Sequence, residues 1–224
     1  MSGTKVVQTQ KAYSRPEELT NFITYAFAAV LSFVGLVFLL YFSVQSKSAD
    51  VAYFAVYTLI CTVVFTAGAL CHVLPLGTKS RLICKRFDRL AVCLLISGAF
   101  VPVLLAGLAS GDRTDAVWAY SLIAVIGACV AASVVLNLVG VPAFKVYSLA
   151  LYIIIGWACV IRMSRIVELC GWDMFWLLFS GGAVYLVGTI LCAFEALPAR
   201  HCVWHVFVLC GAALHFASIY SFIL

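Results

Sequence analysis

Seven long apolar segments divide this chain, and they constrain its fold more than any other feature. Each is long enough to cross the roughly 30 Å hydrocarbon layer as a helix, which takes about 20 residues. A helix also satisfies its own backbone hydrogen bonds in lipid. The segments cover residues 20–43, 52–74, 88–108, 116–136, 143–162, 173–194 and 201–223. The sequence therefore predicts an all-α, polytopic membrane protein built as a bundle of seven transmembrane helices.

The seven segments leave little chain for anything else. Of the 224 residues, 65% are hydrophobic and 10% are charged, against about 45–50% and about 25% in a soluble domain. We expect a short cytoplasmic segment over residues 1–19, followed by one membrane domain over residues 20–224. The first segment lacks the basic and then apolar pattern of a cleaved signal peptide, so the first span is expected to direct insertion.

The distribution of lysine and arginine predicts the orientation. With seven spans, ten of these residues fall on one side of the membrane and four on the other. Cytoplasmic loops carry the excess of positive charge, so the N-terminus is predicted to be cytoplasmic. The net charge of +5 lies mostly in loops and indicates orientation rather than nucleic-acid binding. We expect a multi-pass protein of the plasma membrane or an internal membrane, with membrane lipids as partners.

Four ionisable residues gather at one predicted membrane depth. In this orientation His72 ends the second span at the cytoplasmic face, Asp88 opens the third span there, and His201 and His205 open the seventh. Ionisable residues within membrane spans are costly and usually mark a function. This coincidence of depth predicts a functional site near the cytoplasmic face.

The spacing of the histidines indicates a metal site. His201 and His205 are four residues apart, so both project from one face of a helix and can share a metal ion. His72 would complete a three-histidine set, with a fourth position left for water or substrate as in catalytic zinc sites. Asp88 would hydrogen-bond that water and help to deprotonate it. The alternative is that these histidines lie among headgroups and cap helix ends.

Other features predict packing. His215 lies ten residues beyond His205, roughly 15 Å deeper along a helix, and is expected to pack between helices. Gly181, Gly182 and Gly188 would let helices approach closely, with a lipid portal as the alternative. Pro102, late in the third span, predicts a kink next to a cavity.

The sequence resembles the hemolysin III family, which belongs with the progestin and adipoQ receptors (PAQR-like proteins). The stretches that carry the resemblance are "EELTNFITY" (17–25), "GALCHV" (68–73), "KRFDRLAVCLLISGAFVP" (85–102), "GGAVYLVGTI" (181–190) and "HCVWHVFVLCGAALHF" (201–216). The resemblance implies a seven-helix bundle with a cytoplasmic N-terminus. It also implies zinc bound by His72, His201 and His205, with Asp88 in contact with the water that the zinc holds.

Two positions depart from the family pattern. The family usually has a serine four residues before the histidine of the second helix, where this chain has Gly68. The first motif usually ends in Thr-His, and here it ends in Thr24-Tyr25. Neither position is a metal ligand, so the resemblance still implies metal binding, whereas both departures bear on catalysis.

We expect a zinc-dependent hydrolase of a lipid amide, of ceramidase type. Zinc polarises a carbonyl and makes a nucleophile of water at neutral pH, Asp88 would take the proton, and the apolar interior would hold an acyl chain. One alternative is a lipid-responsive PAQR-type receptor with a structural zinc. Others are a pore-forming cytolytic hemolysin and a membrane scaffold whose histidines only pack.

Overall fold

The computed structural model describes residues 14–46, 50–140, 144–193 and 199–223. These residues are helical almost throughout, without any strand, and they include seven stretches long and apolar enough to cross a membrane. The predicted all-α fold with seven spans is confirmed, and the chain is an integral, multi-pass membrane protein.

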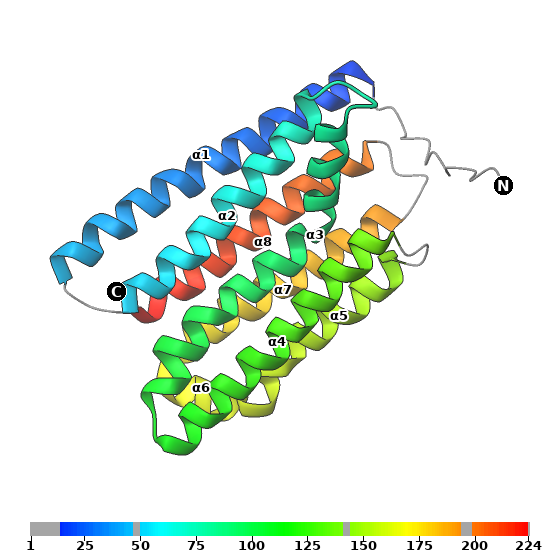
Figure 1. The fold of residues 1–224 in the computed structure, drawn as a ribbon. Coiled ribbons are helices and arrows are strands. Elements are labelled where there is room, and N and C mark those ends of the chain that lie inside the picture. The colour runs from blue at the N-terminus through cyan, green and yellow to red at the C-terminus, as the bar shows by residue number, and fades with distance from the viewer. Residues whose placement is uncertain (1–13, 47–49, 141–143, 194–198, 224) are drawn as a thin grey trace.

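The spans form one bundle of near-parallel helices (Figure 1). The helices are α1 (Arg15–Ser46), α2 (Asp50–Val73), α3 (Lys79–Pro102), α4 (Arg113–Val139), α5 (Phe144–Ala158), α6 (Met163–Cys170), α7 (Trp172–Ala193) and α8 (Arg200–Ile223). The short helix α6 continues the span begun by α5, so the eight helices make seven spans.

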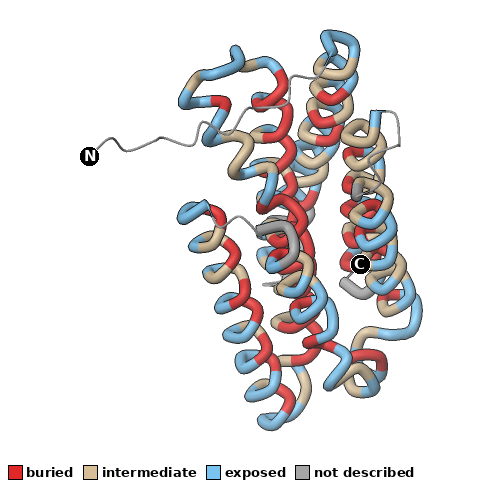
Figure 2. Tube along the Cα trace, turned by 90° about the vertical axis from the view of Figure 1, so that its right-hand side faces the viewer, coloured by how far each residue is buried: buried red, intermediate tan, exposed pale blue. Residues whose placement is uncertain are grey.

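Helix α3 is the centre of the bundle. It packs against α2, α4, α5 and α8, while α1 covers α2 and α8, and α7 packs on α8. In Figure 2 the buried residues run along the inward faces of the helices and the exposed residues along the outer faces. The exposed residues include many large hydrophobic side chains, mainly Leu, Ile and Val with some Phe, Tyr and Trp, as a surface in contact with lipid requires.

The third span is longer than predicted. Helix α3 begins at Lys79 rather than at residue 88, because the Thr78 hydroxyl accepts a hydrogen bond from the Arg81 N–H at 3.2 Å and caps the helix. At the other end of the span, Pro102 is followed directly by a π-helical turn (Val103–Gly107) and then by a 3₁₀ turn (Leu108–Ser110). Proline removes one helical hydrogen bond, which explains an irregularity at this place.

The predicted loop after residue 162 is wrong, because most of it is helix α6. A 3₁₀ turn (Cys159–Arg162) leads from α5 into α6. The fully buried carboxylate of Asp115, in the first turn of α4, accepts hydrogen bonds from Arg162 at 2.6 Å and Arg165 at 2.8 Å. This cluster therefore ties the start of α4 to the end of the fifth span.

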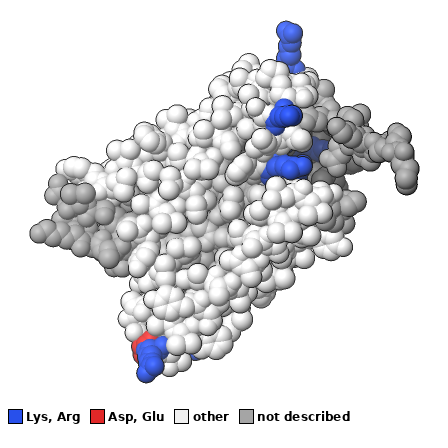
Figure 3. Space-filling model, viewed as in Figure 1, with Lys and Arg blue, Asp and Glu red and all other residues white. Residues whose placement is uncertain are grey.

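Charged residues lie at the two ends of the bundle. Figure 3 shows lysine and arginine side chains on this face only near the two ends, with a broad band free of charge between them. This band matches the hydrocarbon layer that the seven spans are long enough to cross.

Candidate metal centre

Three histidines meet at one end of the bundle. His72 lies near the C-terminal end of α2, and His201 and His205 lie in the first turns of α8. One ligand atom from each of the three lies within 4.8 Å of the others. The ring centroids of His201 and His205 are 4.4 Å apart, and that of His72 is 5.4 and 5.2 Å from them. The structure thus brings together the three histidines that the sequence analysis singled out.

The donor set fits a zinc ion. His205 is fully buried, and neither of its ring nitrogens makes a hydrogen bond of standard geometry among the described residues, although the backbone carbonyl of Asn21 lies close to the ring. A buried polar group without a partner is costly, and a metal ion would satisfy it. Zn²⁺ accepts imidazole nitrogens and commonly has three protein ligands in catalytic sites.

Glu18 of α1 orients one of these histidines. The Nδ1–H of His72 donates to Oε2 of Glu18 at 2.7 Å, and the other oxygen of Glu18 forms an ion pair with Arg81. Arg81 also donates to the carbonyl oxygen of Leu74 at 2.7 Å. With Nδ1 engaged, the Nε2 atom of His72 is the one suited to hold a metal, as in the carboxylate–histidine–zinc arrangement. Sequence reasoning missed Glu18 and Arg81 as members of the site.

Two more polar residues of α1 lie at the cluster. The ring of Tyr25 stacks on that of His205, with centroids 3.7 Å apart and ring planes 14° from parallel. Asn21 and Tyr25 are both fully buried; the amide of Asn21 has no hydrogen-bond partner among the described residues, and the hydroxyl of Tyr25 lies near the carboxylate of Asp88. Glu18, Asn21 and Tyr25 are spaced i, i+3, i+7, so a single face of α1 borders the site. The spacing shows in the sequence that these residues share a face of the helix, but not that this face borders the histidines.

Asp88 lies near the cluster but is not one of its three grouped ligands. It does not open the third helix, as the sequence analysis expected, since α3 begins at Lys79. Its Oδ1 atom is buried without a hydrogen-bond partner in the described part of the chain. Its carboxylate interacts electrostatically with His201 and with the hydroxyl of Tyr25. Asp88 therefore lies within electrostatic range of the histidine cluster.

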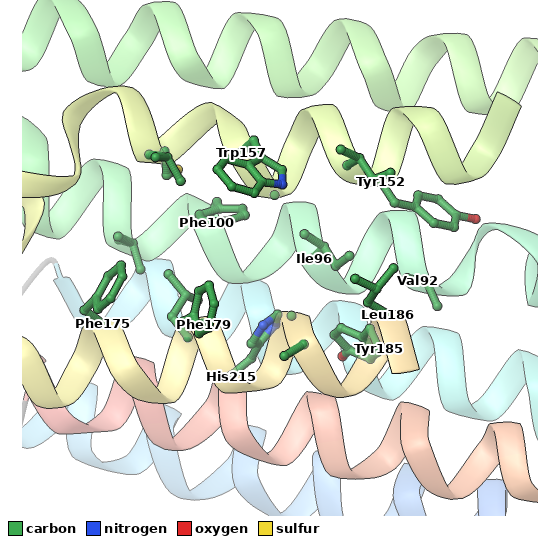
Figure 4. Close-up of a pocket in the computed structure, with 18 of the residues that line it drawn as sticks. Val92, Ile96, Phe100, Tyr152, Trp157, Phe175, Phe179, Tyr185, Leu186 and His215 are labelled. Carbon is green, nitrogen blue, oxygen red and sulfur yellow. The ribbon is translucent and has the colours of Figure 1, made fainter. Parts of the chain in front are cut away.

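An apolar cavity of about 470 Å³ lies between α3, α5 and α7 (Figure 4). Phe100, Trp157, Phe179 and Leu186 point into it. Trp157, Phe179 and Leu186 are also exposed at the bundle surface, so the cavity opens sideways between α5 and α7, toward the lipid. Its described lining includes none of the three clustered histidines, but it reaches Val92, one helical turn from Asp88.

His215 lies apart from the cluster and packs, as predicted. It is buried, its ring meets Tyr185 edge-on with centroids 5.2 Å apart, and it borders the cavity. A side chain on Gly181 would collide with the His215 ring, whereas one on Gly182 would meet nothing within 4 Å. Gly181 therefore serves close packing, and Gly182 lines the cavity.

Known proteins match this chain over nearly its whole length. The model of the family described as haemolysin-III related matches residues 13–216, which include the whole histidine cluster. The chain is 31% identical to Hemolysin-3 of Bacillus cereus over 209 residues, or 93% of this chain and 92% of that protein. It is 29% identical to the Hemolysin-3 homolog of Bacillus subtilis (strain 168) over 201 residues, or 89% and 91% of the two chains.

Proposed function

This chain belongs to the haemolysin III family of membrane proteins, and on that premise we propose that it holds Zn²⁺ at His72, His201 and His205 and hydrolyses an amide bond of a membrane lipid. The observation that carries the proposal is the convergence of three ligand atoms within 4.8 Å, at a largely buried place inside an apolar bundle. Three imidazoles leave a position for a reacting group, which a structural site with four protein ligands would not.

The residues around the cluster divide the chemistry among them. When bound, zinc would polarise the amide carbonyl and activate a water molecule at neutral pH. Glu18 holds the ring of His72 in one tautomer. Asp88 would accept a proton from the attacking water and return it to the leaving amine, the work of a general base and then a general acid. Its Oδ1 atom is buried, and the Tyr25 hydroxyl lies close enough to donate to the carboxylate.

The cavity supports a lipid as the substrate. It is apolar, open toward the membrane and large enough for part of an acyl chain. Val92, which lines the cavity, lies one helical turn from Asp88 along α3. An acyl chain in the cavity would therefore direct its polar end toward the metal centre.

The first test is the zinc content of the detergent-purified protein, measured by mass spectrometry. We expect about one zinc per wild-type chain, and its loss in His201→Ala/His205→Ala. His215→Ala is the matched control, because it removes a buried histidine of the same helix outside the cluster and should retain zinc. A folded wild-type protein without zinc, or a double variant that keeps it, would contradict the metal centre. Release of free amine from lipid amides, lost in Asp88→Asn, would then test the hydrolase.

A lipid-responsive receptor is the second candidate, and the cavity favours it. A lipid can lie there without touching the clustered histidines, because none of them is among the lining residues described. Zinc binding and lipid retention without turnover of any lipid amide would support this function over the hydrolase. The name of the relatives, Hemolysin-3, suggests lysis by a pore instead, for which leakage of dye from vesicles is the readout.

A further inference from the structure

The ring of Tyr25 fills space that a side chain at position 68 would need. Tyr25 lies on α1 and Gly68 on α2, and a Cβ atom added to Gly68 would overlap the Tyr25 ring. The same ring is packed on its other sides by His205 and by Phe65, whose ring centroid is 5.6 Å away in an edge-on contact. The ring of Tyr25 is therefore confined between α2 and α8.

We propose that Tyr25 is a positioning residue of the metal centre, which holds the imidazole of His205 by ring stacking, and that Gly68 is its matched partner, which makes room for the ring. The inference rests on the proposed metal centre. It concerns how that centre is held in place, and not which ligands form it.

The argument begins from the different surroundings of the histidines. His72 is oriented by a hydrogen bond to Glu18. Neither ring nitrogen of His205 makes a hydrogen bond of standard geometry within the described residues, although the backbone carbonyl of Asn21 lies close to the ring, and metal ligands require fixed ring orientations. The near-parallel contact with Tyr25, at 3.7 Å and 14°, is the closest ring contact of His205. Stacking on Tyr25, together with the nearby backbone carbonyl of Asn21, therefore holds the ring of His205, whereas the carboxylate of Glu18 holds that of His72.

The ring of Tyr25, rather than its hydroxyl, carries this role. The hydroxyl is buried and interacts with the carboxylate of Asp88, which is close enough for a hydrogen bond, whereas the contact with His205 is made by the ring. Tyr25→Phe keeps the stacked ring and removes only the hydroxyl. This conservative variant should consequently keep the geometry of the metal centre, whereas Tyr25→Ala should not.

The test is metal affinity and the visible absorption spectrum of the full-length protein loaded with Co²⁺ in place of zinc. We expect Tyr25→Ala to weaken metal binding roughly tenfold to a hundredfold, the range for lost supporting groups around a metal, and to shift the Co²⁺ bands. Tyr25→Phe should resemble the wild type in both. Tyr185→Ala is the control, because Tyr185 is equally buried and contacts His215 instead; it should leave the bands unchanged.

The matched pair is tested by a double-mutant cycle. Gly68→Ala should weaken metal binding in the wild-type background and add no further loss in Tyr25→Ala, because the collision has then gone. Tyr25→Leu replaces Tyr25→Ala if the latter does not fold. Wild-type metal affinity and spectrum in both Tyr25→Ala and Gly68→Ala would overturn the inference alone. A wild-type protein that binds neither zinc nor cobalt would instead overturn the metal centre itself.

Discussion

At the scale of single residues, Glu18 joins the histidine cluster to the polar end of the bundle. One of its oxygens accepts the hydrogen bond from His72 at 2.7 Å, and the other pairs with the buried guanidinium of Arg81. Arg81 in turn donates to the carbonyl oxygen of Leu74, just beyond the end of α2. A change at Glu18 therefore disturbs a histidine ligand and leaves a buried positive charge without this partner.

We predict that Glu18→Gln lowers zinc affinity by about tenfold or more. The amide can still accept a hydrogen bond from His72, but it no longer carries the charge that makes the imidazole a stronger ligand. Competition with a chelator of known affinity measures the change. Glu17→Gln is the matched control, since Glu17 accepts from the Ser14 N–H at 2.8 Å in a capping box that glutamine can also form. Equal zinc affinity in the two variants would contradict the role of Glu18.

The three histidines could be predicted as a site because two sequence features point to them: the spacing of His201 and His205 along one helix, and the membrane depth that they share with His72. His201 and His205 share a helix face, and charge counting placed His72 at the same depth. Glu18 and Tyr25 could not be assigned in the same way, because their partners lie on other helices, 54 residues away for the pair Glu18 and His72. Which helices are neighbours depends on side-chain packing, and no local pattern encodes it.

At the scale of elements, the Asp115 cluster fixes the far end of the fourth and fifth spans. The carboxylate is fully buried, and the two arginines that donate to it come from the 3₁₀ turn and from α6. Removing the shared acceptor leaves two partly buried positive charges close together. Breaking such a cluster is strongly destabilising because a charge is left without compensation.

We predict that Asp115→Ala lowers the apparent melting temperature in detergent by roughly 5 °C or more, while zinc content is unchanged. The cluster lies at the opposite end of α3 from the histidines, so the two effects separate. Glu168→Ala is the control, since Glu168 is exposed and, among the described residues, forms an ion pair with Arg165, three residues away; exposed pairs of this kind contribute little. A melting temperature as high as in Glu168→Ala would show that the cluster does not hold the spans together.

The number of spans followed from hydropathy, but their ends did not. Helix α3 extends nearly to Thr78 through a basic stretch, because a helix outside the lipid needs a cap and not an apolar sequence. Helix α6 was taken for a loop because Arg165 and Glu168 interrupt the apolar pattern. In the structure these polar residues lie on one side of α6, and Ile166 and Val167 are buried on the other.

At the scale of the whole molecule, the bundle is closed unevenly. Helices α1, α2, α3 and α8 pack closely around the metal centre, whereas α5 and α7 border the cavity without packing closely on each other. Sequence alone does not reveal such an opening, because each helix presents lipid-facing side chains around much of its surface. From the sequence, an opening to lipid at Gly182 was only the alternative to close helix packing.

We predict that Gly182→Phe blocks lipid binding in the cavity. A Cβ atom added at Gly182 meets nothing within 4 Å, so the rest of the ring would project into the space that an acyl chain needs, while the loss of glycine favours the helix. Gly127→Phe on α4 is the matched control, since Gly127 is equally open but does not line the cavity. Labelling by a fatty acid with a photoreactive group should fall several-fold in Gly182→Phe and remain unchanged in Gly127→Phe, with zinc content unaltered in both.

Because the cavity opens sideways, the same block should also stop turnover of a lipid amide if the acyl chain enters by this route. Undiminished labelling would mean that lipid reaches the protein elsewhere, and retained labelling at residues of α1 would identify the face near Tyr25 as the entry.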